Sequence, residues 1–246
     1  LGNTCFLNTV MQCISHTYEL NDFLNDKTYM KRLNHIPESI LLIEWDKLRE
    51  MIWKEDSSNN SFIVPTSFVT NIQKVARIKQ RDIFTGFSQN DVSEFLYFLI
   101  ESFHESIKRK VTINIEGNIK TPTDELASKC FTMFQNMYSE EYSELLDMFY
   151  GIHVSRITDI SGKVIGDTCE PYFSLSLQIP KDIKQPSLID CFESFVKPEI
   201  LDGDNKFELE DSPGTKVVVK KQINFWSFPN ILIIDLKRFS NNMTKN

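Results

Sequence analysis

The hydrophobic pattern divides the chain into a helical first part and a strand-rich second part. In the first part, apolar residues recur three and four positions apart, as they do on the buried face of a helix. This spacing predicts helices within residues 1–20, 37–52, 65–75, 91–107 and 124–142. After residue 150, apolar residues alternate with polar ones, which predicts strands at 150–158, 173–179 and 216–223. The apolar run at 231–236 predicts a central strand covered on both faces, and the fold class is α+β.

The first predicted helix begins at a cysteine. Gly2, Asn3 and Thr4 are residues of turns and helix N-caps, and they precede Cys5 directly. The apolar positions that follow have mostly helical spacing and are Phe6, Val10, Cys13, Ile14 and Leu20. Unpaired N–H groups and the positive end of the helix dipole favour a thiolate in the first turn, which makes Cys5 a candidate nucleophile. The alternative is a buried, unreactive Cys5, because free cysteines are usually buried.

A second polar cluster precedes the helix predicted at 91–107. Ser88 or Asn90 is expected to cap this helix, which places Asp91 and Glu94 in its first turn, where the dipole favours carboxylates. Considered alone, the pattern gives the two acids only this stabilising role at a helix terminus. The predicted core face of the helix consists of Val92, Phe95, Leu96, Leu99, Phe103 and Ile107.

Composition narrows the class of protein further. With 246 residues, of which 41% are hydrophobic and 25% charged, the chain suits one large domain or two small ones of a soluble globular protein. No apolar run approaches the ~20 residues of a membrane span, and the first residues lack a signal-like stretch, so we expect an intracellular protein without membrane contact. The net charge of −7 argues against broad nucleic-acid binding and is compatible with a partner that presents basic residues.

The cysteines indicate neither a disulfide framework nor a cysteine zinc site. Five of them stand at positions 5, 13, 130, 169 and 191, an odd number without a C-x-x-C pair. We therefore expect reduced thiols. Cys130 lies on the apolar face of the helix predicted at 124–142, which places it in the core.

Two motifs resemble the signature boxes of the ubiquitin-specific proteases. The run Gly2-Asn3-Thr4-Cys5-Phe6-Leu7-Asn8, followed by Gln12, resembles the cysteine box of that family, in which the cysteine attacks the bond after the C-terminal glycine of ubiquitin. The run from Phe87 to Leu96 resembles the second box, Gln-Gln-Asp-x-x-Glu-Phe-Leu, with Asn90 in place of the second glutamine. Phe103-His104-Glu105 then stands where the family has Leu-His-Glu.

The resemblance implies a role for each of these residues. Cys5 is the expected catalytic nucleophile, and Gln89, Asp91 and Glu94 are expected to bind the arginine-bearing tail of ubiquitin. Carboxylates suit this task because their pairing with arginine is directional and can be bidentate. His104, midway along a helix, is expected to be a structural or surface histidine and not the catalytic base.

Similar blocks continue to residue 239, so the resemblance covers the chain from end to end. It implies a papain-like cysteine protease fold with a helical thumb, a β-rich palm and β fingers. We expect the thumb with its nucleophile helix at 1–110, the fingers and adjoining palm strands at 111–225, and the start of a truncated palm at 226–246. The expected partner is ubiquitin or a ubiquitinated protein, bound by a monomer that needs no cofactor.

The chain departs from the family pattern at the tips of the fingers. Many members hold a zinc ion there with two C-x-x-C pairs. The matching stretches of this chain are Asp159-Ile160-Ser161-Gly162 and Leu209-Glu210-Asp211-Ser212, which contain no thiol. The sequence therefore predicts no structural zinc, because Cys169 alone cannot make the site.

The resemblance also implies residues beyond both ends of the chain. In the family, an asparagine one position upstream of Leu1 donates a hydrogen bond to the oxyanion, and the general-base histidine follows the Lys237-Arg238-Phe239 strand. The histidines of this chain are residues 16, 35, 104 and 153, all upstream of that strand. We therefore expect a segment of a longer protein that hydrolyses little or nothing alone. The alternatives are a ubiquitin-binding pseudoenzyme of the same fold and an unrelated scaffold with a buried Cys5.

Overall fold

The chain folds into two compact units. The computed structural model describes residues 3–54, 62–86, 88–209 and 212–238. We call Leu1–Lys110 together with Glu141–Met148 the helical unit, and Val111–Glu140 together with Phe149–Asn246 the sheet unit. Among the described residues, no helix combines the length and the hydrophobicity that crossing a membrane requires.

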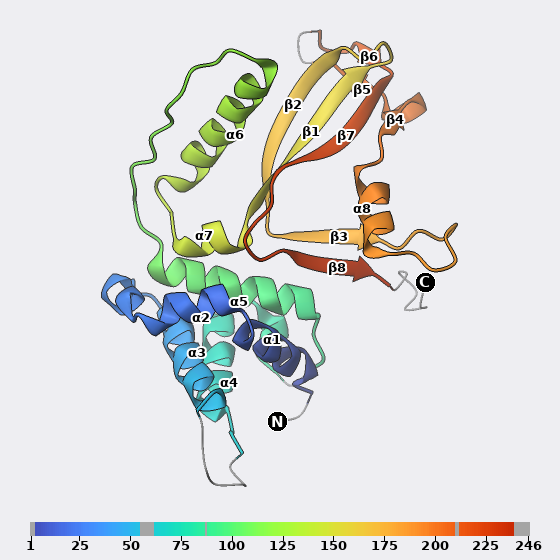
Figure 1. Ribbon diagram of the computed structural model, residues 1–246. Coiled ribbons are helices and arrows are strands. Elements are labelled where there is room, and N and C mark those ends of the chain that lie inside the picture. The colour runs from blue at the N-terminus through green and yellow to red at the C-terminus, as the bar shows by residue number, and fades with distance from the viewer. Residues whose placement is uncertain (1–2, 55–61, 87, 210–211, 239–246) are drawn as a thin grey trace. The chain divides into compact units, whose positions relative to one another are not determined.

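The helical unit is built around one central helix, α5 (Val92–Ile107). Helices α1 (Cys5–Ser15) and α3 (Ser39–Ile52) pack against α5, and α4 (Thr66–Ile78) packs against α3 (Figure 1). The unit also contains the shorter elements α2 (Tyr18–Asn25), η1 (Thr28–Arg32), η2 (Asp82–Phe84) and α7 (Glu144–Phe149), the last residue of which belongs to the sheet unit. The four long helices confirm the helical spacing read from the first part of the sequence.

The buried face of α5 is largely the predicted one. Val92 is an exception, because it is the first residue of the helix and is 40% exposed, and Leu96 is half-buried. The predicted core residues that are fully buried are Phe95, Leu99, Phe103 and Ile107, joined by Phe98 and Ile100. The packing of α5 against α1 and α3 therefore rests on aromatic and aliphatic side chains together.

The first helix is shorter than the sequence pattern suggested. It ends at Ser15, and the buried Leu20 belongs to α2. Ile14 is buried as predicted, but Cys13 is exposed. The buried residues of α1 recur three and four positions apart as the pairs Phe6 and Leu7, Val10 and Met11, and Ile14 and Ser15, and Cys13 lies outside this face.

The apolar positions of α3 predict a buried face of Ile40, Leu41, Ile43, Leu48, Met51 and Ile52, and of these Leu41 and Leu48 are buried as predicted. Met51 is 48% exposed, and Ile40 and Ile43 are only half-buried. Leu42, Trp45, Asp46 and Arg49 are buried as well. Hydrophobic spacing could not place Asp46 and Arg49 on this face, because an ion pair reads as a surface feature in the sequence.

The carboxylate of Asp46 is the centre of a buried polar network. It accepts hydrogen bonds from Lys27 Nζ at 2.5 Å, from the Tyr29 hydroxyl at 2.5 Å and from Arg49 at 2.7 Å. Burial alone would raise the pKa of Asp46, but these hydrogen bonds outweigh it and hold the pKa below its usual range. The network joins η1 and the residue before it to α3.

The sheet unit contains a four-stranded antiparallel sheet with the strand order β2-β1-β7-β4 (Figure 1). Its strands are β1 (Gly151–Asp159), β2 (Val164–Tyr172), β4 (Glu199–Leu201) and β7 (Val219–Ser227). Helix α6 (Pro122–Tyr138) packs against β2. A capping box between Thr121 and Asp124 starts this helix, and Cys130 on it is buried as predicted.

Two smaller strand pairs complete the sheet unit. Strand β3 (Ser174–Gln178) pairs in parallel with β8 (Ile233–Lys237), and β5 (Phe207–Glu208) pairs with β6 (Lys216–Val217). Helix α8 (Leu188–Val196) packs against β3 and β7, and a short helix, η3 (Gly203–Asn205), follows β4. On β3, Leu175 and Leu177 are buried between exposed polar residues, which confirms the predicted alternation.

Two strand predictions were wrong in detail. The run at 231–236 is not a central strand, because β8 starts at Ile233, pairs with β3 alone within the described residues, and ends with Leu236 38% exposed. Its apolar residues Leu232 and Ile234 pack against the core around Leu175 and Leu177 without a second neighbouring strand. The strand predicted at 216–223 is divided between β6 and β7 at Val218.

Acidification is expected to destabilise the helical unit through His104. Its Nδ1 lies 2.7 Å from the Ser143 hydroxyl, and burial lowers the pKa of this histidine below its ordinary value of 6.5. Below about pH 6.5 the unfolded chain binds a proton that the folded chain still refuses, so the free energy of unfolding falls as the pH drops towards the lower folded pKa. Urea unfolding at several pH values measures this slope. The His104→Asn variant should lose this part of the pH dependence, and an unchanged slope would assign it to another group.

Candidate active site

Cys5 is the first residue of α1 and its side chain is exposed. Helix α1 begins with the hydrogen bond from Asn8 N to the carbonyl of Thr4, at 2.9 Å, and the Thr4 side chain does not cap the helix. The Thr9 hydroxyl donates to the Cys5 carbonyl at 2.8 Å. The thiol thus lies at the end of α1 where the helix dipole favours negative charge, as the sequence predicted.

Asp91 is the N-cap of α5, a position that the sequence assigned to Ser88 or Asn90. Its Oδ1 accepts a hydrogen bond from the backbone N–H of Glu94 at 2.9 Å. The Asn90 side chain instead donates to the Ser88 carbonyl at 3.1 Å. Gln89, Asp91 and Glu94 are all exposed, so their side chains are accessible at the start of α5. Phe87, which begins the motif, lies outside the described residues.

Aromatic packing brings the starts of α1 and α5 together. Phe6, which follows Cys5, meets Phe95, which follows Glu94, edge to face with ring centroids 5.0 Å apart. The ring of Phe84 lies 6.3 Å from Phe6 and 5.4 Å from Phe95. All three rings are buried. The contact between Phe6 and Phe95 therefore holds the backbone of Cys5 close to the backbone of Glu94.

The sequence of this chain matches the model of a known protein family over its whole length. The ubiquitin carboxyl-terminal hydrolase model matches residues 1–246. The chain belongs to the ubiquitin carboxyl-terminal hydrolase family. Human ubiquitin carboxyl-terminal hydrolase 2 is 35% identical over 98% of this chain, which corresponds to 39% of the human protein. Ubiquitin carboxyl-terminal hydrolase 4 of Saccharomyces cerevisiae is 29% identical over 100% of this chain and 27% of its own length.

Solved structures of similar chains show the same fold. A chain of the SAGA DUB module Ubp8/Sgf11/Sus1/Sgf73 bound to monoubiquitin matches with a TM-score of 0.67 at 22% identity, over 99% of this chain and 48% of that chain. The same module bound to ubiquitin aldehyde matches with a TM-score of 0.66. These matches confirm the α+β fold expected for the family, while the division into thumb, fingers and palm stays a prediction. The chain spans less than half of the length of these relatives.

Two histidines of the helical unit do not lie where a base for Cys5 would be needed. His16 is the C-cap of α1, about 16 Å from Cys5 along the helix at 1.5 Å rise per residue. It lies 2.8 Å from the Gln12 carbonyl and packs its ring against Trp53. His104 lies in the last turn of α5, and not midway along the helix as expected, and its Nδ1 lies 2.7 Å from the Ser143 hydroxyl.

A carboxylate organises the turn between β1 and β2, the first of the two stretches that the sequence predicted to be fingertips without zinc. Asp159 Oδ1 accepts hydrogen bonds from the Ser161 N–H at 2.8 Å, the Ser161 hydroxyl at 2.6 Å and the Lys163 N–H at 2.9 Å. These bonds lower the pKa of Asp159 and close the hairpin between β1 and β2. Within the described residues, no group of three or more His, Cys, Asp or Glu side chains is placed to hold a metal ion. Glu210 and Asp211 of the second fingertip stretch lie outside those residues.

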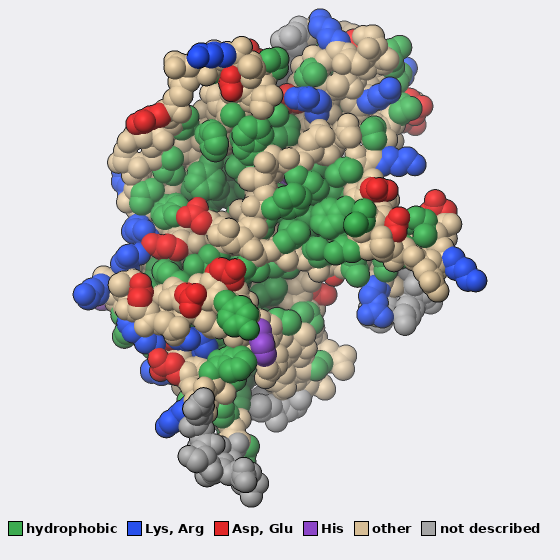
Figure 2. All heavy atoms as spheres, in the orientation of Figure 1, with side chains coloured by type: hydrophobic (Ala, Val, Ile, Leu, Met, Phe, Trp, Pro, Cys, Tyr) green, Lys and Arg blue, Asp and Glu red, His purple; other side chains and the backbone are tan. Residues whose placement is uncertain are grey.

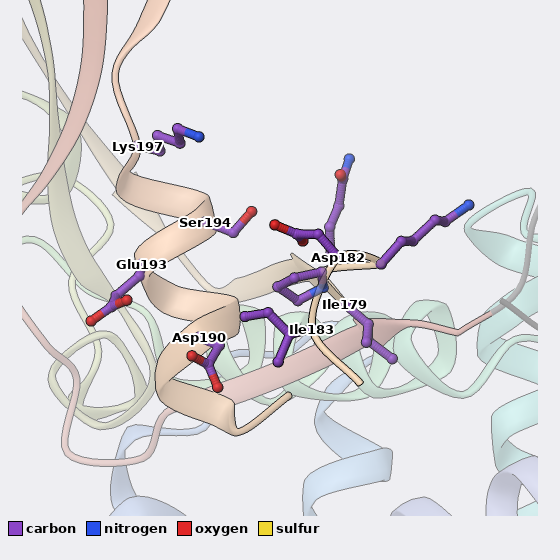
Figure 3. A pocket seen from close by; sticks show the side chains of 10 residues that line it. Ile179, Asp182, Ile183, Asp190, Glu193, Ser194 and Lys197 are labelled. Atoms are coloured by element: carbon purple, nitrogen blue, oxygen red, sulfur yellow. The ribbon is translucent and has the colours of Figure 1, made fainter. Parts of the chain in front are cut away.

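The sheet unit also contains a polar hollow of about 450 Å³ beside α8. Asp182 from the segment after β3 and Ser194 from α8 point towards each other across it (Figure 3). The carboxylate of Asp190, at its edge, is already bound to the Ser187 N–H at 2.7 Å and the Ser187 hydroxyl at 2.6 Å, which caps α8. The described lining of the hollow contains no histidine or cysteine.

Hydrophobic side chains gather on the surface beside α8 (Figure 2). Phe195 of α8 stacks on Phe225 of β7 with centroids 6.0 Å apart, and Phe225 stacks on Phe228 at 4.8 Å. Phe228 is 56% exposed. Apolar surface of this kind often marks a contact with another protein.

Proposed function

We propose that this chain carries the nucleophile and part of the ubiquitin-binding surface of a deubiquitinase, an enzyme that hydrolyses the bond after the C-terminal glycine of ubiquitin. The observation that carries the proposal is the exposed Cys5 at the dipole-favoured start of α1, beside an acidic helix start on α5. Membership of the ubiquitin carboxyl-terminal hydrolase family supports it.

In the proposed reaction, the Cys5 thiolate attacks the carbonyl carbon of ubiquitin's terminal glycine. Amide donors stabilise the oxyanion that forms, and the bond to the lysine amine breaks as a histidine gives that amine a proton. The resulting thioester is then hydrolysed by water, which regenerates the thiol. The family resemblance implies that the base is a histidine that follows the Lys237-Arg238-Phe239 stretch, and in this chain His16 and His104 are hydrogen-bonded to other groups.

The acidic motif of α5 would hold the basic tail of ubiquitin in register. Asp91 uses Oδ1 for the cap of α5, which leaves Oδ2 for an arginine. Glu94 and Gln89 are exposed on the same helix start and can accept further hydrogen bonds. Charge-assisted hydrogen bonds of this kind are directional, so they suit the positioning of an extended peptide beside Cys5.

Neutralising the two acids is expected to weaken substrate binding. Asp91→Asn and Glu94→Gln should each raise KM for a ubiquitin substrate by about tenfold, because each removes the equivalent of one charge-assisted hydrogen bond. The start of α5 should be unaffected in Asp91→Asn, since asparagine is also a good N-cap. Steady-state kinetics with a fluorogenic ubiquitin conjugate measure the change. Glu125→Gln, an exposed first-turn acid of α6, is the matched control and should leave KM unchanged. An equal rise of KM in all three variants would point to a general charge effect.

The proposed function is tested by labelling with ubiquitin that carries a C-terminal electrophile. We expect the complete gene product containing this chain to form a covalent adduct through Cys5, and the Cys5→Ala variant to form none. Peptide mapping identifies the labelled cysteine. Labelling at Cys13 instead, or equal labelling of the variant, would contradict the proposal.

The second candidate is a pseudoenzyme that binds ubiquitin without hydrolysing it. It predicts saturable binding of ubiquitin with no adduct in the same experiment. The ubiquitin-bound structures of similar chains favour a ubiquitin partner in both cases. Those chains are found in multi-protein modules, so they give the expected monomer no support, and the oligomeric state and the expected intracellular location stay predictions.

A further inference from the structure

Two cysteines of the sheet unit lie close enough to react with each other. The Cys130 thiol on α6 donates a hydrogen bond to Cys169 Sγ on β2, with the two sulfur atoms 3.3 Å apart. Cys130 is fully buried and Cys169 is half-buried. The proposed ubiquitin chemistry uses neither thiol, and the pairing was not visible in the sequence because 39 positions separate them.

We propose that Cys130 and Cys169 form a site of reversible oxidative modification, where a hydroperoxide converts the two thiols into a disulfide that ties α6 to β2. The sulfur atoms of a disulfide are ~2.05 Å apart, so the two atoms must approach by only about 1.2 Å. Both residues sit on regular elements that already pack against each other.

The surroundings of the two sulfur atoms indicate which cysteine reacts with the peroxide first. The Cys130 sulfur lies in an apolar cluster with Ile152 and Val154, and burial, followed by the hydrogen bond to Cys169, raises the pKa of Cys130 to about 12. Cys130 therefore stays a protonated thiol at neutral pH. Cys169 is the more accessible sulfur and is the one that meets the peroxide first.

The two steps balance as follows. The Cys169 sulfur attacks one oxygen of the peroxide and gives up its proton, the O–O bond breaks, and Cys169 becomes a sulfenic acid; the other oxygen takes up that proton and leaves as water or an alcohol. Cys130 then attacks the Cys169 sulfur, the S–S bond forms, and the S–O bond breaks. The Cys130 proton goes to the departing hydroxyl, which leaves as water. Two thiols are oxidised and one hydroperoxide is reduced.

The disulfide would stabilise the sheet unit against unfolding. It links a helix to a strand across 39 residues of chain, and a cross-link of this kind restricts the unfolded state. The oxidised protein should therefore melt at a higher temperature than the reduced protein.

The test uses the Cys5→Ala, Cys13→Ser double variant, which removes the two exposed thiols. After treatment with hydrogen peroxide, the remaining thiols are alkylated under denaturing conditions and the peptides are mapped by mass spectrometry. We expect the peptide with Cys130 to be joined to the peptide with Cys169, and Cys191 to be alkylated. The melting temperature should rise on oxidation and return on addition of dithiothreitol.

Single replacements identify the role of each sulfur. In a Cys169→Ser background, Cys130 should remain alkylatable and the rise in melting temperature should disappear. In a Cys130→Ser background, Cys169 should stop at the sulfenic acid, which dimedone traps. Recovery of Cys169 as a sulfinic acid beside an alkylatable Cys130 in the protein with both cysteines would overturn the proposal. Mapping of the unmodified chain gives the same answer should a variant fail to fold.

Discussion

Replacing Cys5 with serine should reduce the hydrolysis of ubiquitin conjugates by about 10⁴-fold or more in the complete gene product. A serine hydroxyl stays protonated at neutral pH, and the start of α1 favours negative charge on a thiol much more easily than on an alcohol. The side chain of Cys5 is exposed and makes no packing contribution comparable to that of the neighbouring Phe6, so the fold should be unaffected. The rate is measured by release of a fluorophore from the C-terminus of ubiquitin.

Cys13 provides the matched control for this prediction. It is a second exposed cysteine on α1, near the opposite end of the helix. Cys13→Ser should retain full activity, and the affinity of Cys5→Ser for ubiquitin, measured by calorimetry, should equal that of the unmodified protein. If Cys5→Ser kept a tenth or more of the activity, as a rough threshold, the nucleophile would have to be sought elsewhere.

Removal of the buried Asp46 carboxylate should lower the free energy of unfolding by about 3–5 kcal/mol. Asp46→Ala leaves Arg49, whose side chain is 7% exposed, and the buried Tyr29 hydroxyl without their shared acceptor. The loss arises mainly from this uncompensated burial of a charge and a hydroxyl. Urea denaturation of the purified chain at neutral pH measures it.

Glu50→Ala is the control for the Asp46 prediction. Glu50 binds the same Lys27 at 2.6 Å, but its side chain is 55% exposed. Its removal should cost less than about 1 kcal/mol, because water screens exposed ion pairs. The contribution of Asp46 is complete above its ordinary pKa of 3.8 and is lost as the pH falls through the lower folded value, so the unmodified chain and Asp46→Ala should converge in strong acid. Equal losses for the two variants at neutral pH would contradict this account.

The sequence predicted those features that short segments determine by themselves. The start of α1 at Cys5 followed from the turn residues before it, and the alternation on β3 followed from the period of a half-buried strand. The N-cap of α5 was missed because Ser88, Asn90 and Asp91 are all good caps, and the choice depends on which of them the packing of α5 places at the turn.

Features that depend on distant partners could not be predicted in the same way. The hydrophobic pattern correctly placed Leu41 and Leu48 of α3 in the core, but it missed Asp46, because a buried aspartate looks like a surface residue until Lys27, Tyr29 and Arg49 are brought to it. Helix α8 was not predicted, although the capping box of Ser187 and Asp190 is a local sequence signal for its start. The contact of Phe6 with Phe95 joins two motifs 89 positions apart and has no signal in either one.

Because of that ring contact, a substitution in the core can change the geometry of the proposed active site. Phe84 touches both rings but carries no reactive group, and it is 3% exposed. A smaller side chain at this position would leave a cavity beside both rings, into which the neighbouring backbone of Cys5 and Glu94 would partly relax. Drift at one interior phenylalanine could thus alter the alignment of the nucleophile with the incoming ubiquitin tail, while every residue that meets ubiquitin stayed the same.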